Sequence, residues 1–341
     1  MKRGLDRKRI GFMVTALLVC FLVSTPAVAQ RTLKFASWAP QQDTMNYAPN
    51  LWMKALEERT AGKVKVTPYY SETLGKLGNS LDMLKTGICD LALMPTAALS
   101  KHFRVIDVLA VPGVVSNRAV GTEVLYALLE RGLLEKEFAG FKAIVLQAHD
   151  PFYLNFTKKK VTTLEDLKGM KIRFPSVTTK MLFEAWGATP VSVAPPDLFM
   201  AINTGVLDGT SASPGYMVLS KMYEIMKYGM WGNAISSGAN IVLMSRKTWD
   251  SFPKDVQAIM DDLNAKAKQQ YLEAGERQDV DSLKTVKAAG FETYSLSADE
   301  LRRWEKLAQP VVDFWVSDTE AAGYPGKAAI ETARQVVQKF K

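Results

Sequence analysis

Histidine is scarce in this chain of 341 residues, and the scarcity limits the chemistry that the chain could perform. The two histidines, His102 and His149, lie far apart, and the sequence contains no HExxH, CxxC, P-loop or GxSxG motif. Metal centres and catalytic triads need several such residues to converge. We therefore predict no metal site, no cofactor and no catalytic residue.

Cysteine is equally scarce, and the two cysteines are not expected to form a disulfide. Cys20 falls in an N-terminal segment that we expect to be removed, which leaves Cys89 alone. Stability must then come from the hydrophobic core, which can be large in a chain of this length.

A concentrated stripe of positive charge is also missing. The formal net charge is +8, and residues 1–29 contribute +4 of it, so the remainder is only mildly basic. The longest positive run, residues 158–160, is typical of a solvated turn. The charge pattern therefore predicts no nucleic-acid partner.

The N-terminus carries the order of features that is typical of a secretory signal peptide. Lysines and arginines precede an apolar run at residues 10–23, and Ala27-Val28-Ala29 offers the small-x-small pattern of a cleavage site. The apolar run is too short to span a bilayer. We expect cleavage after Ala29 and a periplasmic mature protein. A lipid anchor at Cys20 and a buried N-terminal helix are the alternatives.

Strand and helix patterns alternate twice along the rest of the chain. One series begins at residue 32 and the other near residue 150, and each predicts a mostly parallel sheet covered by helices. A long helical stretch follows Pro253, with no further proline until Pro310. No flexible linker separates the two series, so we predict two α/β lobes with a ligand cleft between them.

Arg173 is the first candidate for a binding residue. It lies in a short apolar strand, Ile172-Arg173-Phe174, immediately before Pro175. A planar guanidinium group holds a carboxylate through two parallel hydrogen bonds, so an arginine at a strand end facing a cleft suits anion capture. A structural ion pair or an exposed strand position is the alternative.

Residues 163–175, with the sequence TLEDLKGMKIRFP, resemble the most characteristic stretch of the solute-binding subunits of tripartite ATP-independent periplasmic (TRAP) transporters, first associated with C4-dicarboxylates. Two further matches follow in the family's order, WGATPV at residues 186–191 and TGVLDG at residues 204–209. Segments at residues 71–90 and 249–253 also fit, so the resemblance covers nearly the whole mature chain.

The resemblance implies an α/β, two-lobe periplasmic binding protein fold of type II-like architecture, with a long helix spanning both lobes. We expect residues 30–150 and about 240–280 to form lobe I. Residues 151–239 and about 281–341 are expected to form lobe II.

The resemblance also implies that Arg173 pairs with the ligand carboxylate. Segments that line family pockets supply four further candidates here: Trp38, Ser213, Trp231 and Asn233.

Two departures from the family pattern bear on the ligand. Many members carry a second arginine in the strand that here reads FYLNF, at residues 152–156. Others carry a metal-assisting glutamate soon after the Asp-Gly pair, where this chain has TSAS. A second ligand carboxylate would then be poorly paired and costly to bury. Phe152 and Tyr153 favour an apolar or aromatic ligand part instead, unless they are ordinary core residues.

We therefore predict a monomeric, non-enzymatic periplasmic protein that passes a small organic monocarboxylate, with an apolar or aromatic part, to membrane permease subunits. One alternative is a C4-dicarboxylate ligand whose far end meets neutral donors or another cation. Others are a binding protein of an ATP-driven transporter or a sensor, and a secreted enzyme that relies on carboxylates.

Overall fold

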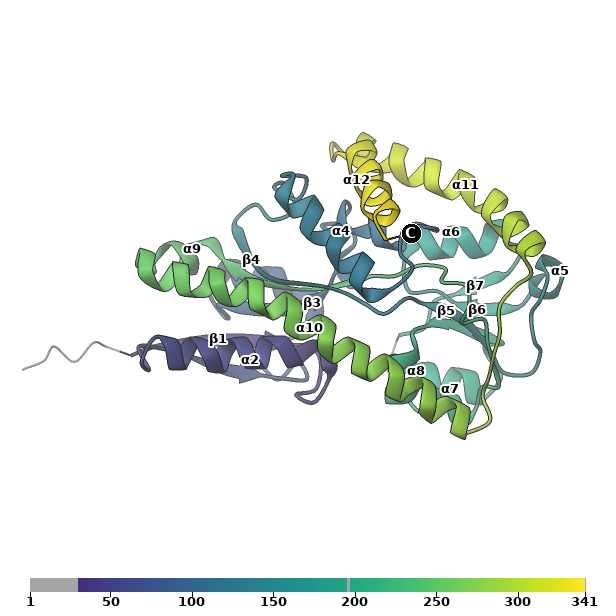
Figure 1. Cartoon of the computed structure of the whole chain (residues 1–341), viewed down its shortest axis with the longest axis horizontal. Coiled ribbons are helices and arrows are strands. Elements are labelled where there is room, and N and C mark those ends of the chain that lie inside the picture. The colour runs from purple at the N-terminus through teal and green to yellow at the C-terminus, as the bar shows by residue number, and fades with distance from the viewer. Residues whose placement is uncertain (1–29, 195–196, 341) are drawn as a thin grey trace, which may run out of the picture.

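Two separate β-sheets organise the computed structural model, which describes residues 30–194 and 197–340 (Figure 1). The expected signal segment and its cleavage site lie outside the described residues. Among those described, no helix combines the length and hydropathy needed to cross a bilayer. Cys89 is a free, buried thiol, and burial raises its pKa to about 12.

The sheet of lobe I has five strands in the order β2-β1-β3-β10-β4. β2 and β3 run parallel to β1, whereas β10 is antiparallel to both β3 and β4. The bounds are β1 Arg31–Ser37, β2 Val64–Tyr69, β3 Leu91–Pro95, β4 Phe141–Ala148 and β10 Ala239–Ser245.

The sheet of lobe II has six strands in the order β11-β9-β5-β8-β6-β7. β6 runs parallel to β7 and β8, and β5 is antiparallel to β8 and β9. The bounds are β5 Tyr153–Phe156, β6 Lys171–Arg173, β7 Thr189–Val191, β8 Gly209–Ala212, β9 Tyr228–Gly229 and β11 Glu292–Thr293.

Helices cover both sheets, as the two α/β series predict. The α-helices are α2 Thr44–Arg59, α3 Ser80–Thr86, α4 Arg118–Glu130, α5 Leu164–Leu167, α6 Val177–Ala185, α7 Leu198–Asn203, α8 Pro214–Leu219, α9 Arg246–Asp250, α10 Lys254–Ala288, α11 Ala298–Ala321 and α12 Gly326–Gln338. The 3₁₀ helices are η1 Leu77–Asn79, η2 Thr96–Leu99, η3 Ile106–Ala110 and η5 Met222–Glu224.

Alternation along β10 divides the core of lobe I into two layers. Val242 and Met244 pack with residues of α2 and α10, whereas Ile241 and Leu243 pack with residues of α4 and α12. The period of two that a strand imposes on its side chains therefore decides which helix each residue meets.

The sheet of lobe II is divided in the same way. Leu154 and Phe156 of β5 pack with α6 and α11, while Ala212 of β8 packs on the opposite side with α7, α8 and the end of α10. Because Tyr153 and Asn155 alternate with Leu154 and Phe156, their side chains lie on the α10 side of the sheet.

The long helix α10 joins the lobes along one side of the molecule (Figure 1). Its 35 residues extend over roughly 50 Å at the usual rise per residue. Met260 and Leu263 belong to the core of lobe I, and Val286 belongs to the core of lobe II. The predicted two-lobe fold with a helix spanning both lobes is confirmed.

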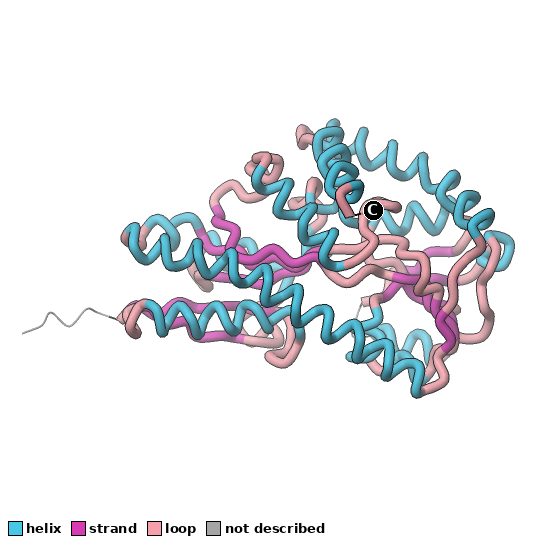
Figure 2. Tube along the Cα trace, viewed as in Figure 1, coloured by secondary structure: helices cyan, strands magenta, loops and turns pink. Residues whose placement is uncertain are grey.

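Two irregular segments also cross between the lobes, one from β4 to β5 and the other from β9 to β10 (Figure 2). The segments are hydrogen-bonded to each other. His149 N donates to Gly238 O at 2.8 Å, and Phe152 N donates to Ser236 O at 2.8 Å. The connection between the lobes is thus a paired two-stranded crossing beside α10.

The C-terminal helices differ from the expected division of the chain. Trp304 of α11 packs in lobe II, but Trp315 near its end and Ala333 of α12 belong to the lobe I core around α4. Residues 281–341 therefore do not all lie in lobe II, since α11 crosses back to lobe I. The amphipathic patterns predict buried faces, but they do not say which lobe supplies the partner surface.

Candidate functional site

The carboxyl ends of strands from both sheets meet where the chain crosses between the lobes. Asn240, at the start of β10, pairs with Pro95 at the end of β3, and Tyr153, at the start of β5, pairs with Ala212 at the end of β8. β1 and β6 run parallel to β3 and β8, so they end at the same junction. Ligands of open α/β sheets bind outside such carboxyl ends. This junction, on the side covered by α10, is the candidate binding site.

Arg173 occupies the last position of β6 at this junction. It pairs with Val191 of β7 and Thr210 of β8, and Pro175 soon afterwards lacks the N–H that would continue the strand. Its side chain lies on the α10 side of the sheet, because neighbouring Ile172 packs on the other side. Nε donates to Val193 O at 3.3 Å, which fixes the orientation of the guanidinium group.

No carboxylate of the described chain is among the groups that affect the pKa of Arg173. Burial lowers this pKa, and the nearby phenol of Tyr216 partly opposes the effect. A buried cation that lacks an anionic partner is costly, so such a group is suited to receiving an anion from outside the chain.

Aromatic side chains lie on the same face of the sheet as this cation. The rings of Tyr153 and Trp231 have centroids 6.2 Å apart, and Trp231 lies 5.3 Å from Phe291. Trp231 Nε1 donates to Asn155 Oδ1 at 2.7 Å, which fixes the indole. Burial raises the pKa of Tyr153 to about 12, with smaller contributions from Asp150 and Asp279, so its hydroxyl remains a neutral donor.

Trp38 approaches from lobe I, just beyond β1. It is half-buried and packs against the core layer formed by α2 and α10. Its Nε1 is fully buried and has no hydrogen-bond partner among the described residues. Trp38 therefore reaches the junction from lobe I, whereas Arg173, Tyr153 and Trp231 reach it from lobe II.

The other three predicted residues have local roles. Ser213 Oγ accepts from Tyr216 N at 3.3 Å and caps α8, and Asn233 Oδ1 accepts from Leu296 N at 2.7 Å. Phe152 packs against the core between α6 and α11, and its ring centroid lies 5.6 Å from that of His149. These contacts give each residue a structural function, and a ligand contact for any of them stays a prediction.

Sequence reasoning missed two polar residues at the lobe I edge of the junction. Gln147 of β4 and Asn240 of β10 are fully buried and lie opposite each other in the sheet. The signal was present, because each is the one amide side chain of a mainly apolar strand.

It also missed Arg118, a second cation at the hinge. Nη2 lies 2.9 Å from Asp279 Oδ1 and 3.5 Å from Asp150 Oδ1, and Nη1 donates to the hydroxyl of Tyr271 at 2.8 Å. Burial alone would lower its pKa, but Tyr271 and the two carboxylates outweigh burial and raise it. Arg118 is thus already paired, and it holds α4, α10 and the crossing segment together.

The site offers no arrangement of the kind that metals require. Within residues 30–194 and 197–340, no three histidine, cysteine, aspartate or glutamate side chains gather closely enough to hold a metal ion. The stretch of residues 210–213, where the resemblance led us to look for a glutamate, forms most of β8 and ends in Ser213, which caps α8.

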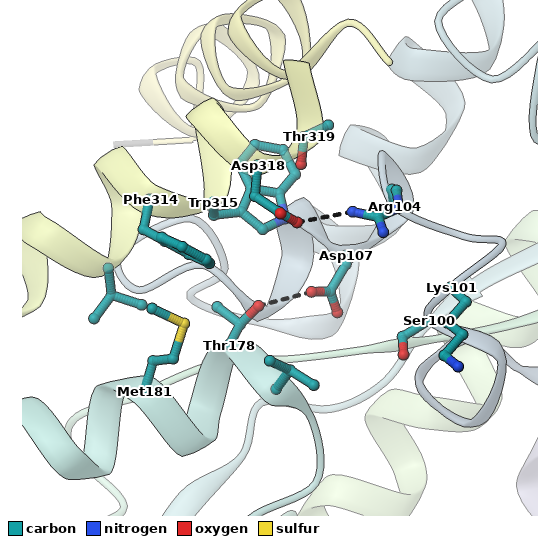
Figure 3. Close-up of a pocket in the computed structure, with 12 residues that line it drawn as sticks. Ser100, Lys101, Arg104, Asp107, Thr178, Met181, Phe314, Trp315, Asp318 and Thr319 are labelled. Atoms are coloured by element: carbon teal, nitrogen blue, oxygen red, sulfur yellow. Dashed lines mark hydrogen bonds and ion pairs between the residues drawn. The ribbon is translucent and has the colours of Figure 1, made fainter. Parts of the chain in front are cut away.

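A pocket of about 170 Å³ lies elsewhere, between α6, α11 and the loop from η2 to η3 (Figure 3). None of the predicted ligand residues lines it. Two contacts cross it: Thr178 Oγ1 donates to Asp107 Oδ2 at 2.8 Å, and Arg104 Nη1 lies 2.8 Å from Asp318 Oδ2. Since Asp107 belongs to lobe I and Thr178 to lobe II, this pocket marks a second place where the lobes touch.

Comparisons with known proteins agree with this architecture. The chain is 27% identical over 327 residues to the C4-dicarboxylate-binding periplasmic protein DctP of Rhodobacter capsulatus, which covers 91% of this chain and 94% of that protein.

Two solved structures share the fold. One is a marine metagenome TRAP solute-binding protein specific for aromatic acid ligands, in complex with metahydroxyphenylacetate; it has a TM-score of 0.83 and 21% identity, and the match covers 92% of this chain and 100% of that one. The other is a TRAP solute-binding protein from Rhodoferax ferrireducens with copurified benzoate; it has a TM-score of 0.81 and 22% identity, and the match covers 90% and 98%.

The family model for bacterial extracellular solute-binding proteins, family 7, matches residues 35–318. The match includes both sheets, the crossing segments, α10 and the Arg173 strand. The family resemblance predicted from the sequence is therefore confirmed, and the chain belongs to the bacterial extracellular solute-binding proteins of family 7.

Proposed function

We propose that this protein captures a small organic monocarboxylate with an apolar or aromatic part in the periplasm and delivers it to the membrane subunits of a TRAP transporter. The observation that carries the proposal is Arg173, a half-buried guanidinium group without a carboxylate partner among the described residues, on the same face of the sheet as the ring pair of Tyr153 and Trp231. The carboxylate would bind the terminal nitrogens of Arg173, because Nε is engaged by Val193 O. The apolar part of the ligand would pack against the rings.

The charges around the junction favour one carboxylate over two. Arg118, a buried cation at the hinge, is already paired with Asp150 and Asp279. Asp43 and Asp150 lie close enough to each other to affect the pKa of Asp43. A second ligand carboxylate near these groups would meet like charges in a poorly hydrated place.

The known ligands of similar proteins support an aromatic acid. Related structures hold benzoate, 3-hydroxybenzoate and mandelate. The relative from Rhodobacter capsulatus instead bears the name of a C4-dicarboxylate-binding protein, so a dicarboxylate is the second candidate ligand.

Binding would act by shifting the two lobes toward a closed form. Arg173 and the rings belong to lobe II, whereas Trp38 belongs to lobe I, so a ligand that touches both sets binds best when the lobes are together. A ligand shifts a conformational equilibrium only by such a difference in affinity. We further propose that the chain acts as a monomer without catalytic turnover, after cleavage following Ala29.

A ligand screen on the mature chain, beginning at Gln30, tests the proposal. We expect benzoate or mandelate to raise the melting temperature by mass action and to bind with one-to-one stoichiometry in calorimetry. Succinate and malate should produce much smaller shifts. Strong binding of a C4-dicarboxylate without binding of any monocarboxylate would contradict the proposed ligand, and chemical conversion of a bound acid would contradict the absence of turnover.

A further inference from the structure

Polar side chains end the apolar layer of lobe I at the carboxyl edge of its sheet. On the α10 side, Val242 and Val145 belong to the core, and the next residues on the same face are Asn240 and Gln147. These two amides lie directly opposite each other in the register of β4 and β10. The face that is apolar along the sheet therefore becomes polar where it reaches the junction.

The two amides are fully buried, but their hydrogen bonding is incomplete. Neither polar atom of the Gln147 amide has a hydrogen-bond partner among the described residues, whereas the Asn240 amide contacts Met45 and interacts with His149. Buried side-chain amides are nearly always hydrogen-bonded, since leaving one unpaired forfeits its hydration without replacement. The Gln147 amide, which gives the described fold no hydrogen bond, calls for another explanation.

Further polar atoms without a partner among the described residues lie in the same core layer and on the crossing segments. Trp38 Nε1 lies in the same core layer, and Asn240 Nδ2 contacts Met45, which packs in that layer too. His149 Nε2 and Ser236 Oγ, on the two paired crossing segments, are likewise unpartnered among the described residues. We call Gln147, Asn240 and Trp38 the lobe I cradle.

The cradle presents donors and acceptors together. Gln147 offers both, Asn240 Oδ1 accepts, and Trp38 Nε1 donates. A carboxylate could satisfy only the donors, and Asp43, which accepts from Met45 N at 3.0 Å, would lie near it. An apolar group would leave all of these atoms unpaired. A hydroxyl group both donates and accepts without carrying charge, so it fits the set.

We propose that the lobe I cradle receives a hydroxyl group on the part of the ligand that lies away from its carboxylate, which makes hydroxylated monocarboxylates the preferred class. The inference rests on the proposed function, because it takes Arg173 as the carboxylate site. It adds a second recognition point in the opposite lobe. A ligand that joins Arg173 to the cradle would couple hydroxyl recognition to closure of the lobes.

Calorimetry with matched acids tests the proposal. The pairs are benzoate against its 2-, 3- and 4-hydroxy derivatives, phenylacetate against its ring-hydroxylated derivatives, and butyrate against 3- and 4-hydroxybutyrate. At least one hydroxylated acid should bind about tenfold or more tightly than its parent, since buried polar groups reject an analogue that leaves them unpaired. If every hydroxylated acid binds less than about tenfold more tightly than its parent acid, the inference is wrong. If parent acids bind, that result leaves the proposed function intact, whereas a failure of all monocarboxylates to bind contradicts the proposed function itself.

Two variants identify the cradle as the source of the preference. Gln147→Met and Asn240→Leu should each remove most of the hydroxyl advantage while the affinity for the parent acid stays within about threefold. The melting temperature of Gln147→Met without ligand should not fall, because neither replaced atom has a partner among the described residues. That of Asn240→Leu should fall only slightly, since the variant loses the weak contact of Nδ2 with Met45. Gln257→Met is the matched control, since Gln257 is also buried but donates to Trp249 O at 2.9 Å. It should lower the melting temperature and keep the hydroxyl preference. Retention of the preference in both cradle variants overturns the assignment.

Discussion

At the scale of single residues, Arg173 differs from the buried Arg118 by what surrounds it. Arg118 is held by two carboxylates and a phenol, whereas Arg173 is anchored, within the described residues, through Nε to a backbone carbonyl, with Tyr216 nearby. The first arrangement stabilises a hinge, and the second suits the ligand carboxylate that we propose.

This difference predicts the behaviour of Arg173 variants. Arg173→Ala should weaken binding of the carboxylate ligand by about 2–5 kcal/mol, because the anion would be buried without its partner. Arg173→Lys should recover only part of the loss, since an ammonium group lacks the planar fork. Calorimetry measures both effects. The unfolding free energy without ligand should change little, as no carboxylate loses a partner.

Arg131→Ala provides the comparison for Arg173. Arg131 donates to Thr332 at 2.8 Å and to Gln335 at 2.9 Å, and so joins α4 to α12 away from the junction. Its removal should leave ligand affinity unchanged. Near-normal affinity in Arg173→Ala would refute the assignment of Arg173.

The residues of the site could be foreseen only where the relevant neighbours are close in sequence. Arg173 is recognisable because its strand and the following proline form a local motif. The pairing of Arg118 depends on Asp279, which is 161 positions away, and the amide of Asn233 is engaged by Leu296, which is 63 positions away. Such contacts are set by tertiary packing, so no local pattern reveals whether a polar group is free for a ligand.

At the scale of elements, a side chain of α4 restricts which residue type can stand at one position of α10. Gly275 lies inside this helix, where glycine is ordinarily about 1 kcal/mol less favourable than alanine. A Cβ at Gly275 would lie 2.3 Å from Arg118 Nε and 2.4 Å from its Cδ. Arg118 cannot move aside without breaking its contacts with Asp279 and Tyr271.

Gly275→Ala should therefore destabilise the protein in spite of its better helix propensity. Overpacking of this kind costs about 1–3 kcal/mol, which outweighs the propensity gain. Denaturant unfolding measures the change. Gly78→Ala is the control, because a Cβ there meets no atom within 4 Å. An increase in stability for Gly275→Ala would show that Arg118 is not held as tightly as its contacts indicate.

The sequence patterns predicted the helices and strands better than they predicted which elements pair or pack together. Strand alternation and the proline at the start of α10 indicated two α/β lobes and a long helix, the family resemblance implied that this helix spans both lobes, and all of these are present. The insertion of β10 between β3 and β4, and the return of α12 to α4, were not predictable from periodicity. Periodicity identifies an apolar face, but the choice of its partner depends on the path of the whole chain.

At the scale of the whole molecule, the contact between Asp107 and Thr178 joins lobe I to lobe II away from the proposed ligand site (Figure 3). Burial raises the pKa of Asp107 from 3.8 to about 7, and the Thr178 hydroxyl partly opposes the shift. Separation of the lobes would return this carboxyl to water and lower its pKa toward the ordinary value. We therefore expect the proposed closure of the lobes to be coupled to the protonation of Asp107.

The sign of the coupling follows from the direction of the shift. Between about pH 4 and pH 7 the carboxyl would be ionised in the open form and protonated in the closed form, so closure takes up a proton. The closed form, and with it the ligand affinity, should be favoured at the lower end of this window and decline as the pH rises through about 7. Because Asp107 keeps some exposed surface, we expect a slope below one logarithmic unit per pH unit.

Calorimetry at several pH values between 5.5 and 7.5, with a ligand ionised throughout, measures this dependence. Asp107→Asn should flatten the profile, since an amide does not titrate yet can still accept from Thr178. Thr178→Val should keep a pH dependence but move its midpoint upward, because the variant removes the hydroxyl that favours the ionised carboxylate. Burial raises the pKa of Glu137 to about 8, and the Asp107 charge adds to the shift, so Asp107→Asn should also lower the pKa of Glu137. The difference between wild type and variant therefore reports Asp107 together with its effect on Glu137. Identical slopes for the wild type and Asp107→Asn would mean that closure does not depend on this contact.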